Sequence, residues 1–382
     1  MTRSPTIVNV VDVVTLGESM VTFLPTRPGR LADVPSFERG IGGAESNTAC
    51  VLAALGHSTR WVSRVGADGF GSHLVERIAG YGVDVGAVRT DPARPTGVYF
   101  RTAADRATAA HEVAYYRAGS AASAMSVTNT DLTAARAGRV LHLSGITAAL
   151  SAECLGLVRH LARPAAGRPL LSFDVNHRPN LWPGTGGAEV LLELARAADI
   201  VFVGEDEAEH TWGVTGGPAA IRALLPEPAL LIVKQAAKGA TAFAHDDAGE
   251  PLRPAMGTPT AGQGAGADSS APDIEPATRP ATAPPAFEPA PHVDVVAPVG
   301  AGDAFAAGFL SATLRGLPVE RRLRHGHLAA AAALTTPADL ATPAALGHAD
   351  RLAALDDQAW GRLRLGPGWT QADRAPEEAN TP

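Results

Sequence analysis

Lysine is almost absent from this chain. Only 2 of its 32 cationic side chains are lysines, Lys234 and Lys238, and they lie four residues apart. Aspartate and glutamate number 39, which gives a net charge of -7. The chain therefore lacks the broad cationic surface that a nucleic-acid backbone or an anionic lipid surface requires, and we expect no nucleic-acid partner.

Cysteine and long apolar runs are scarce as well. Cys50 and Cys154 are too few for a disulfide framework or a cysteine-based metal site. No stretch approaches the roughly 18 uninterrupted apolar residues of a membrane span, and the N-terminus lacks an apolar region followed by a small-residue cleavage site. These features predict a cytoplasmic protein with no membrane partner.

Short β-prone runs alternate with helical patterns along the 382 residues, and no internal repeat is visible. The predicted strands are 11–16, 58–65, 96–101, 139–143, 169–174, 200–203, 229–234 and 240–244. The predicted helices include 45–55, 70–81, 188–197, 205–212, 302–315 and 319–334. This alternation predicts an α/β fold with a mainly parallel sheet covered on both faces, whose ligands bind at the carboxyl ends of the strands.

Three segments depart from this alternation. Residues 20–40 and 96–120 carry alternating β-prone side chains and are predicted to form a small sheet that acts as a lid. Segment 249–291 holds 10 prolines and 10 alanines among its 43 residues, too little apolar surface to offset the entropy of ordering. We interpret it as a low-complexity insertion within a single domain of residues 11–365, followed by a mobile tail at 366–382.

The strongest local motif is Gly300-Ala301-Gly302-Asp303, which is followed by an apolar helical pattern. Small residues at a loop-to-helix junction let backbone N–H groups converge on a phosphate at the positive end of the helix. A carboxylate in the first turn can then accept the proton of an attacking hydroxyl. The alternative is an ordinary aspartate favoured by the helix dipole.

Three motifs in this order resemble the ribokinase-like, or PfkB, family of carbohydrate kinases. They are Gly42-Gly43-Ala44-Glu45-Ser46-Asn47, Val65-Gly66-Ala67-Asp68-Gly69-Phe70-Gly71 and Gly300-Ala301-Gly302-Asp303. The resemblance implies a three-layer sandwich with a small β-sheet lid. It also implies that Asp303 is the catalytic base and that Gly300, Ala301 and Gly302 form the anion hole for ATP.

Within this family, the segments 115–122, 141–147 and 172–182 resemble 2-keto-3-deoxygluconate kinases, so the expected substrate is a small-molecule sugar acid. An arginine fork suits the carboxylate of such a substrate. The resemblance implies that six residues bind the sugar: Gly43, Tyr99, Tyr115, Arg117, Arg178 and Asp339. The alternatives are core aromatics for the two tyrosines and solvated surface cations for the two arginines; the role of Asp339 is left open.

On the nucleotide side, the resemblance implies that ATP lies along the strand–turn–strand that holds Lys234 and Gly239. It places Gly204 near the phosphates and Glu207 near Mg²⁺, where Glu207 acts through water. The acidic residues of segment 205–209 are explained equally well as the solvent-exposed first turn of a helix. Ala297 departs from the family pattern, which leaves the use of a monovalent cation open.

Two other functions compete with the leading hypothesis. One is a fructokinase-like or ribokinase-like enzyme that phosphorylates an uncharged sugar. The other is a catalytically dead sensor of sugar or nucleotide. Three departures from the family pattern motivate it: Gly204 in place of Asn, Ala236 where many members have Gly, and Ala297. A homo-oligomer formed through the lid is a further arrangement to test.

Overall fold

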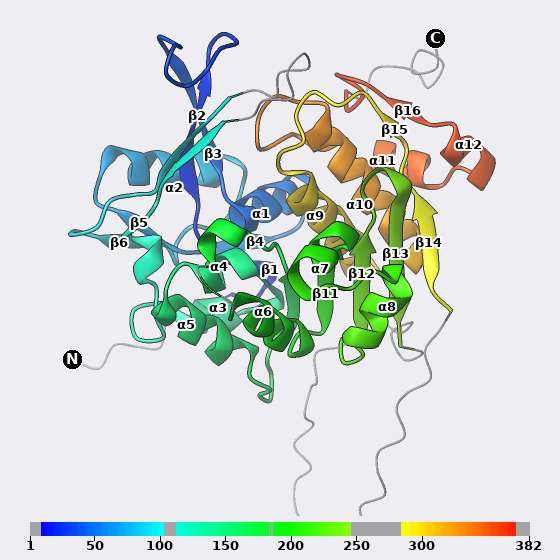
Figure 1. Ribbon diagram of the computed structural model, residues 1–382, viewed down its shortest axis with the longest axis horizontal. Helices are drawn as coiled ribbons and strands as arrows, with labels where there is room; N and C mark the ends of the chain where they lie inside the picture. Colours follow the sequence, from blue (N-terminus) through cyan, green and yellow to red (C-terminus); the bar gives the residue numbers. More distant parts are fainter. Residues whose placement is uncertain (1–8, 103–111, 183, 185, 246–283, 372–382) are drawn as a thin grey trace, which may run out of the picture.

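The computed structural model describes residues 9–102, 112–182, 184, 186–245 and 284–371. Across these residues, eight strands form the main sheet in the order β14-β13-β12-β11-β10-β9-β1-β4 (Figure 1). Their bounds are β1 Val11–Leu16, β4 Thr59–Val62, β9 Gly138–Ser144, β10 Leu170–Asp174, β11 Ile200–Gly204, β12 Leu230–Lys234, β13 Gly239–Ala244 and β14 Ala286–Pro289. Neighbours from β4 to β12 are parallel, whereas β13 pairs antiparallel with both β12 and β14.

Helices cover both faces of this sheet, which confirms the predicted three-layer α/β fold. On one face pack α3 (Leu132–Arg136), α4 (Gly145–Ala149), α5 (Ala152–Ala162), α6 (Gly187–Arg196), α7 (Glu205–Trp212) and α8 (Gly217–Leu224). On the other pack α1 (Ala44–Ala54), α9 (Ala301–Leu314) and α10 (Val319–Leu334). Strand β11 and the first four residues of β12 are apolar because both faces of the sheet are buried there. In β11, Val201 and Val203 belong to one core, and Ile200 and Phe202 to the other.

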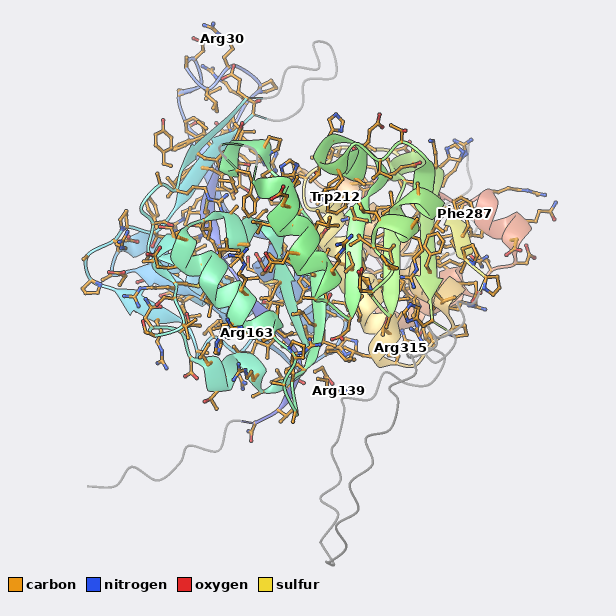
Figure 2. All side chains as sticks on the ribbon, turned by 60° about the horizontal axis from the view of Figure 1, so that its bottom comes forward. Arg30, Arg139, Arg163, Trp212, Phe287 and Arg315 are labelled. Carbon is orange, nitrogen blue, oxygen red and sulfur yellow. The ribbon has the colours of Figure 1, made fainter. Side chains whose placement is uncertain are left out.

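A separate four-stranded sheet has the order β3-β2-β7-β8, and its strands fall in the two segments predicted for the lid. They are β2 Met20–Pro25, β3 Phe37–Gly42, β7 Val98–Arg101 and β8 Val113–Tyr116. Figure 1 shows the hairpin of β2 and β3 projecting from the main body, and Figure 2 shows Arg30 at its far tip. Successive side chains of β7 point to opposite faces of this sheet. The Phe100 ring stacks on Phe23, with 4.7 Å between the ring centroids, and Tyr99 lies beside Tyr115.

The remaining elements complete the fold. They are β5 Arg64–Gly66, α2 Gly69–Gly80, β6 Arg89–Asp91, η1 Ala122–Ala124, η2 Pro179–Leu181, η3 Ala236–Lys238, β15 His292–Val293, α11 Leu346–Ala353, α12 Asp357–Gly361 and β16 Arg364–Leu365. The strand predicted at 58–65 is divided into β4, which pairs with β1, and β5, which pairs with β6. Between them the Ser63 hydroxyl donates to the Gly17 carbonyl oxygen at 2.7 Å.

The end of the predicted insertion is part of the core, which corrects the prediction for 249–291. Residues 246–283 lie outside the described part, but β14 is the edge strand of the main sheet. The buried Glu288 accepts a hydrogen bond from Arg324 Nε at 2.7 Å. Composition missed this strand because a buried ion pair, rather than apolar area, fixes it. Trp369 is also buried, so the predicted mobile tail begins too early; its residues 372–382 lie outside the described part.

Among the described residues, we find no helix with the length and hydropathy that crossing a membrane requires.

The contacts of the Arg324 guanidinium predict that this residue stabilises the folded chain. It binds Glu288, donates to Asp357 Oδ1 at 2.6 Å and lies 5.0 Å from the Trp360 ring centroid. Arg324→Met leaves the buried Glu288 without its cation, so we expect a loss of about 3–5 kcal/mol in the free energy of unfolding, measured by urea titration. The exposed Arg362→Met is the matched control. A loss for Arg324→Met no larger than that of the control would show that the pair does not hold β14.

Candidate active site

Polar residues gather where three neighbouring parallel strands end. β10 ends at Asp174, β11 at Gly204 and β12 at Lys234, and the last two are register partners. Because parallel strands finish at one edge of a sheet, residues distant in sequence meet there. Lys234 Nζ donates to both Asp174 carboxylate oxygens, at 3.1 and 3.2 Å.

The glycine motif opens α9 above this edge. Gly300 is the N-cap residue and has a φ of 75°, a left-handed conformation that favours glycine. A Cβ at this position would lie 2.2 Å from the Asp339 carbonyl oxygen, so any side chain would displace one of the two segments. Ala301 and Gly302 follow in the first turn, and a Cβ on Gly302 would lie 3.5 Å from Lys234 Nζ. The free N–H groups of this turn and the lysine therefore lie close together.

Asp303, in the same turn, is held by α1. Its Oδ2 accepts a hydrogen bond from Asn47 Nδ2 at 3.0 Å. Burial raises the pKa of Asp303 to about 7, and the nearby charge of Asp174 adds to this, whereas Asn47, Arg178 and Lys234 act in the opposite direction. The carboxyl group can thus gain and lose a proton near neutral pH, as a general base requires.

Lys234 and Glu207 complete the charged cluster. Burial lowers the pKa of Lys234, but attraction to Asp174 and Glu207 outweighs it, and the net pKa is raised. Burial raises the pKa of Glu207, which Lys234 opposes. Glu207 Oε2 accepts from the Gly204 N–H at 3.0 Å, and Oε1 accepts from the His177 N–H. Each Glu207 oxygen already has a backbone donor, so contact with Mg²⁺ through water fits this residue better than direct coordination.

Tyr99 and Asp339 meet on the other side of Gly300. The Tyr99 hydroxyl donates to Asp339 Oδ2, and the buried Arg101 Nε donates to Oδ1 at 2.7 Å. Burial raises the pKa of Asp339, but the Arg101 guanidinium favours the ionised form. Tyr115 is half exposed, with its ring centroid 5.3 Å from that of Tyr99. The two tyrosines and Asp339 therefore lie together and form one wall of the candidate site.

Arg117 and Arg178, the two arginines predicted to bind the substrate, have different surroundings. The side chain of Arg117 is mostly buried, and its Nη2 forms an ion pair with the buried Glu18. Arg178 is exposed and donates only to its neighbour's carbonyl oxygen, His177 O at 3.1 Å, among the contacts of the described residues. It is near enough to Asp303 to lower that pKa. Arg178 thus keeps a charge available to a ligand, whereas the charge of Arg117 is already balanced.

The remaining predicted glycines permit close backbone approaches. A Cβ on Gly43 would lie 2.3 Å from the Glu18 carbonyl oxygen. Gly239 has a φ of 142°, and its Cβ would lie 2.3 Å from the Glu288 carbonyl oxygen of β14. Gly43 therefore fits α1 against the β1–β2 connection, and Gly239 fits the predicted nucleotide loop against the edge strand.

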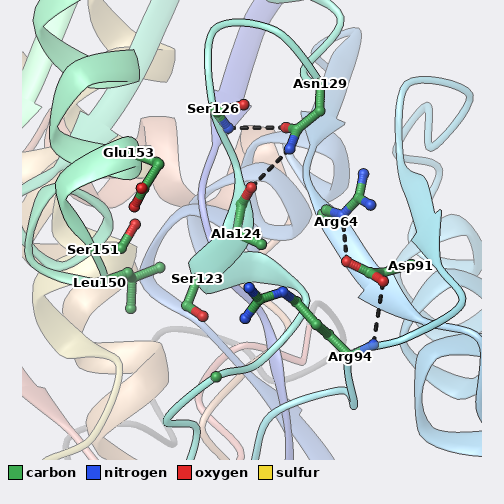
Figure 3. A pocket seen from close by; sticks show the side chains of 11 residues that line it. Arg64, Asp91, Arg94, Ser123, Ala124, Ser126, Asn129, Leu150, Ser151 and Glu153 are labelled. Carbon is green, nitrogen blue, oxygen red and sulfur yellow. Dashed lines mark hydrogen bonds and ion pairs between the residues drawn. The ribbon is translucent and has the colours of Figure 1, made fainter.

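A hollow of about 600 Å³ lies apart from this cluster (Figure 3). Arg64, Arg94 and Asp91 form one of its sides, and Ser151 and Glu153 at the start of α5 form another. Its lining includes none of the predicted site residues. The hollow therefore plays no part in the chemistry argued for Asp303.

Four residues of the site carried no predicted role: Glu18, Asn47, Arg101 and Asp174. Asn47 and Asp174 lie inside motifs that the sequence singled out, so their position was a usable signal. Arg101 follows Tyr99 by two residues on the same strand, which places both on one face. Glu18 lies two residues after the strand 11–16, where ligand-side residues are expected.

Most of the chain matches a known protein family. A model described as "pfkB family carbohydrate kinase" matches residues 11–267 and 285–344. The chain belongs to the PfkB carbohydrate kinase family. It is accordingly an ATP-dependent sugar kinase.

Relatives within the family bear the names of two kinds of sugar kinase. A 2-dehydro-3-deoxygluconokinase from Bacillus subtilis is 31% identical over 334 residues, which cover 86% of this chain and 91% of the relative. "Probable fructokinase-6, chloroplastic" from Arabidopsis thaliana is 29% identical over 348 residues, which cover 87% of this chain and 79% of the relative. A PfkB protein from Polaromonas sp. JS666 has a similar crystal structure, with a TM-score of 0.69, 31% identity and coverage of 86% and 97%.

The raised pKa of Asp303 predicts the pH dependence of the reaction. A base must be deprotonated to work, so kcat/KM for the sugar should be level above about pH 7 and fall about tenfold per pH unit below it. Because Asp174 raises the pKa of Asp303, Asp174→Asn should move this fall to lower pH. Initial rates at saturating ATP, measured with the coupling enzymes in excess at every pH, check both expectations. A profile that stays flat from about pH 5.5 to 8.5 would exclude a base with this pKa.

Proposed function

We propose that this kinase transfers the γ-phosphoryl group of ATP to the primary hydroxyl of 2-keto-3-deoxygluconate, giving the 6-phosphate, with Asp303 as general base. The observation that carries the proposal is a partly buried carboxyl group with a pKa of about 7 at the N-terminus of α9. A hydroxyl proton needs such an acceptor at the moment of attack, and the phosphoryl group needs the free N–H groups of the same turn.

The steps follow from the positions of these groups. The substrate hydroxyl gives its proton to Asp303 as its oxygen bonds to the γ-phosphorus, and the bond from phosphorus to the β-phosphate oxygen breaks to release ADP. The N–H groups of Gly300, Ala301 and Gly302 stabilise the negative charge of the phosphoryl oxygens during transfer. Lys234 lies beside Gly302 and adds its positive charge there.

Magnesium fits the site as a companion of the nucleotide. Mg²⁺ keeps several waters and binds through phosphates and one or two carboxylates, which agrees with the engaged oxygens of Glu207. When bound, the ion neutralises charge on the phosphates. Glu207 and the Gly204 backbone would orient its water ligands, and Gly239 would line the nucleotide.

Recognition of the sugar would use the wall on the lid side. Tyr99, Tyr115 and Asp339 offer hydroxyl and carboxylate groups to the sugar hydroxyls, and the backbone at Gly43 approaches closely. Arg117 would bind the carboxylate of the sugar acid through its N–H groups. Arg178 would bind it through its N–H groups and its positive charge. Closure of the small sheet would exclude water, which otherwise accepts the phosphoryl group. A lid-mediated oligomer and a cytoplasmic location stay predictions.

A kinase of an uncharged ketose is the second candidate. The ion pair between Arg117 and Glu18 favours it, because the pair removes net positive charge from the sugar side. Fructokinases are also among the relatives. The sensor hypothesis rests only on the departures at Gly204, Ala236 and Ala297, and the geometry of Asp303 gives it no support.

Removal of the base tests the chemistry. Asp303→Asn keeps the shape and the contact with Asn47 but cannot accept a proton, so kcat should fall roughly 10²–10⁴-fold with the affinity for both substrates largely kept. Coupled ADP detection measures the rate, and calorimetry measures binding. The exposed Asp206→Asn is the matched control and should behave as wild type. A variant Asp303→Asn with near-normal turnover would refute the assignment.

A substrate panel with two arginine variants tests the sugar acid. Lysine keeps the charge but loses the two-pronged geometry, so Arg117→Lys should raise KM for the acid by a factor equivalent to about 1.5–3 kcal/mol and leave KM for ATP unchanged. Arg178→Lys should also lower kcat, because this loop is near Asp303 and its contacts strengthen in the transition state.

The control substrate is an uncharged ketose, and the control variant is Arg30→Lys at the exposed hairpin tip. Equal damage by Arg117→Lys with the acid and with the ketose would mean that this arginine does not recognise the substrate carboxylate. Far better turnover of fructose than of the acid by the wild-type enzyme would favour the second candidate.

A further inference from the structure

Glu18 is a buried acid at the joint between the main sheet and the small sheet. It stands between the end of β1 at Leu16 and the start of β2 at Met20, and only 2% of its surface is exposed. A carboxylate buried to this extent needs specific partners to remain charged. Its partners therefore indicate why the chain keeps it there.

Both carboxylate oxygens contact the segment that follows β8. Oε1 accepts a hydrogen bond from the Ser120 hydroxyl at 2.6 Å, and Oε2 forms the ion pair with Arg117 but accepts no hydrogen bond within the described residues. The other connection of the small sheet lies against the same group: a Cβ on Gly97, just before β7, would be 3.0 Å from Oε1. One carboxylate thus touches the segments on both sides of the β7–β8 hairpin.

Arg117 has capacity left for a ligand. Its Nε is buried and has no hydrogen-bond acceptor within the described residues, and such a donor is costly unless something fills it. Its guanidinium carbon lies 5.9 Å from the centroid of the Tyr115 ring, part of the wall proposed for the sugar. The guanidinium is thus fixed at one end by Glu18 and lies beside the proposed sugar wall with an unused donor.

A second buried acid shares this cation. Glu45 Oε1 accepts from the Ser144 and Thr147 hydroxyls, both at 2.7 Å, and Oε2 has no partner among the residues that the structure describes. Burial raises the pKa of Glu45, and Arg117 partly opposes this. Arg117 thus lies within electrostatic range of two buried acids, and Glu18 is the one that forms an ion pair with it.

We propose that Glu18 is a positioning residue that orients Arg117, with Ser120, for contact with the sugar. The inference rests on the proposed sugar site, but it holds for an acid or an uncharged ketose alike. Glu18 acts through Arg117 and has no part in proton transfer. Loss of its charge should therefore weaken sugar binding and leave the nucleotide side unaffected.

A double-mutant cycle on Glu18 and Arg117 tests the inference. Glu18→Gln keeps the size and an acceptor for Ser120 but removes the ion pair, so KM for the sugar should rise about tenfold or more, the scale of one charge-assisted hydrogen bond. KM for ATP should stay within about twofold of the wild-type value. In the Arg117→Met background, the same Glu18→Gln change should raise KM for the sugar less than about threefold, because its target is already gone.

Matched variants separate positioning from stability. Glu38→Gln makes the same substitution at an exposed position of β3 and should leave all constants unchanged. Ser120→Ala removes one hydroxyl and should raise KM for the sugar a few-fold with kcat kept, so the test survives even if Glu18→Gln fails to fold. Additive effects in the cycle, or equal increases in KM for sugar and for ATP, would overturn the proposal.

The sugar used is whichever the wild-type enzyme phosphorylates best in the panel. Preference for an uncharged ketose would refute the sugar-acid assignment without affecting the cycle. A cycle without coupling would refute the role of Glu18 whichever sugar is used. The two failures are therefore distinguishable.

Discussion

At the carboxyl ends of the central strands, three carboxyl groups surround the ammonium group of Lys234. The chemistry depends on this excess of negative over positive charge. Asp174 binds Lys234 directly, while Glu207 and Asp303 receive only its more distant field. Burial raises the pKa values of Glu207 and Asp303, and the distant lysine opposes this only in part, although Glu207 is also held by two backbone donors. Among the described residues, the Asp303 carboxylate has one amide donor, Asn47, which leaves it free to exchange a proton.

The site must nevertheless attract the phosphates of the nucleotide. Asp174 already partly balances the charge of Lys234, so the free N–H groups of α9 and the guanidinium of Arg178 supply much of the remaining attraction. Because Gly300 fixes the helix N-terminus against the Asp339 backbone, these donors are in place before a ligand arrives. Preorganised dipoles of this kind stabilise developing charge without reorganisation during the reaction.

The sequence predicted those parts of the molecule that are local. Strand and helix periodicity placed most elements within a few residues of their bounds, and Gly300–Asp303 could be interpreted from one turn of helix. Contacts across the chain escaped prediction: Asn47 and Asp303 are separated by 256 residues, and Arg101 and Asp339 by 238. Nothing in the composition around one member of such a pair identifies the other. The strand β14 escaped for the same reason, since Glu288 gains its significance only from Arg324.

The two arginines near the sugar side show why residue type alone does not determine recognition. Their sequences suggest equal forks for a carboxylate, but Arg117 is balanced by Glu18 and lies near Glu45, whereas Arg178 is exposed and has no carboxylate partner among the described residues. A substrate carboxylate next to Arg117 gains directed hydrogen bonds but little net attraction, because the neighbouring acids repel it. A substrate carboxylate beside Arg178 is attracted by a positive charge that no acid in the described part of the chain balances, although solvent and salt weaken this attraction. Selectivity for a sugar acid would therefore depend on charge at Arg178 and on geometry at Arg117.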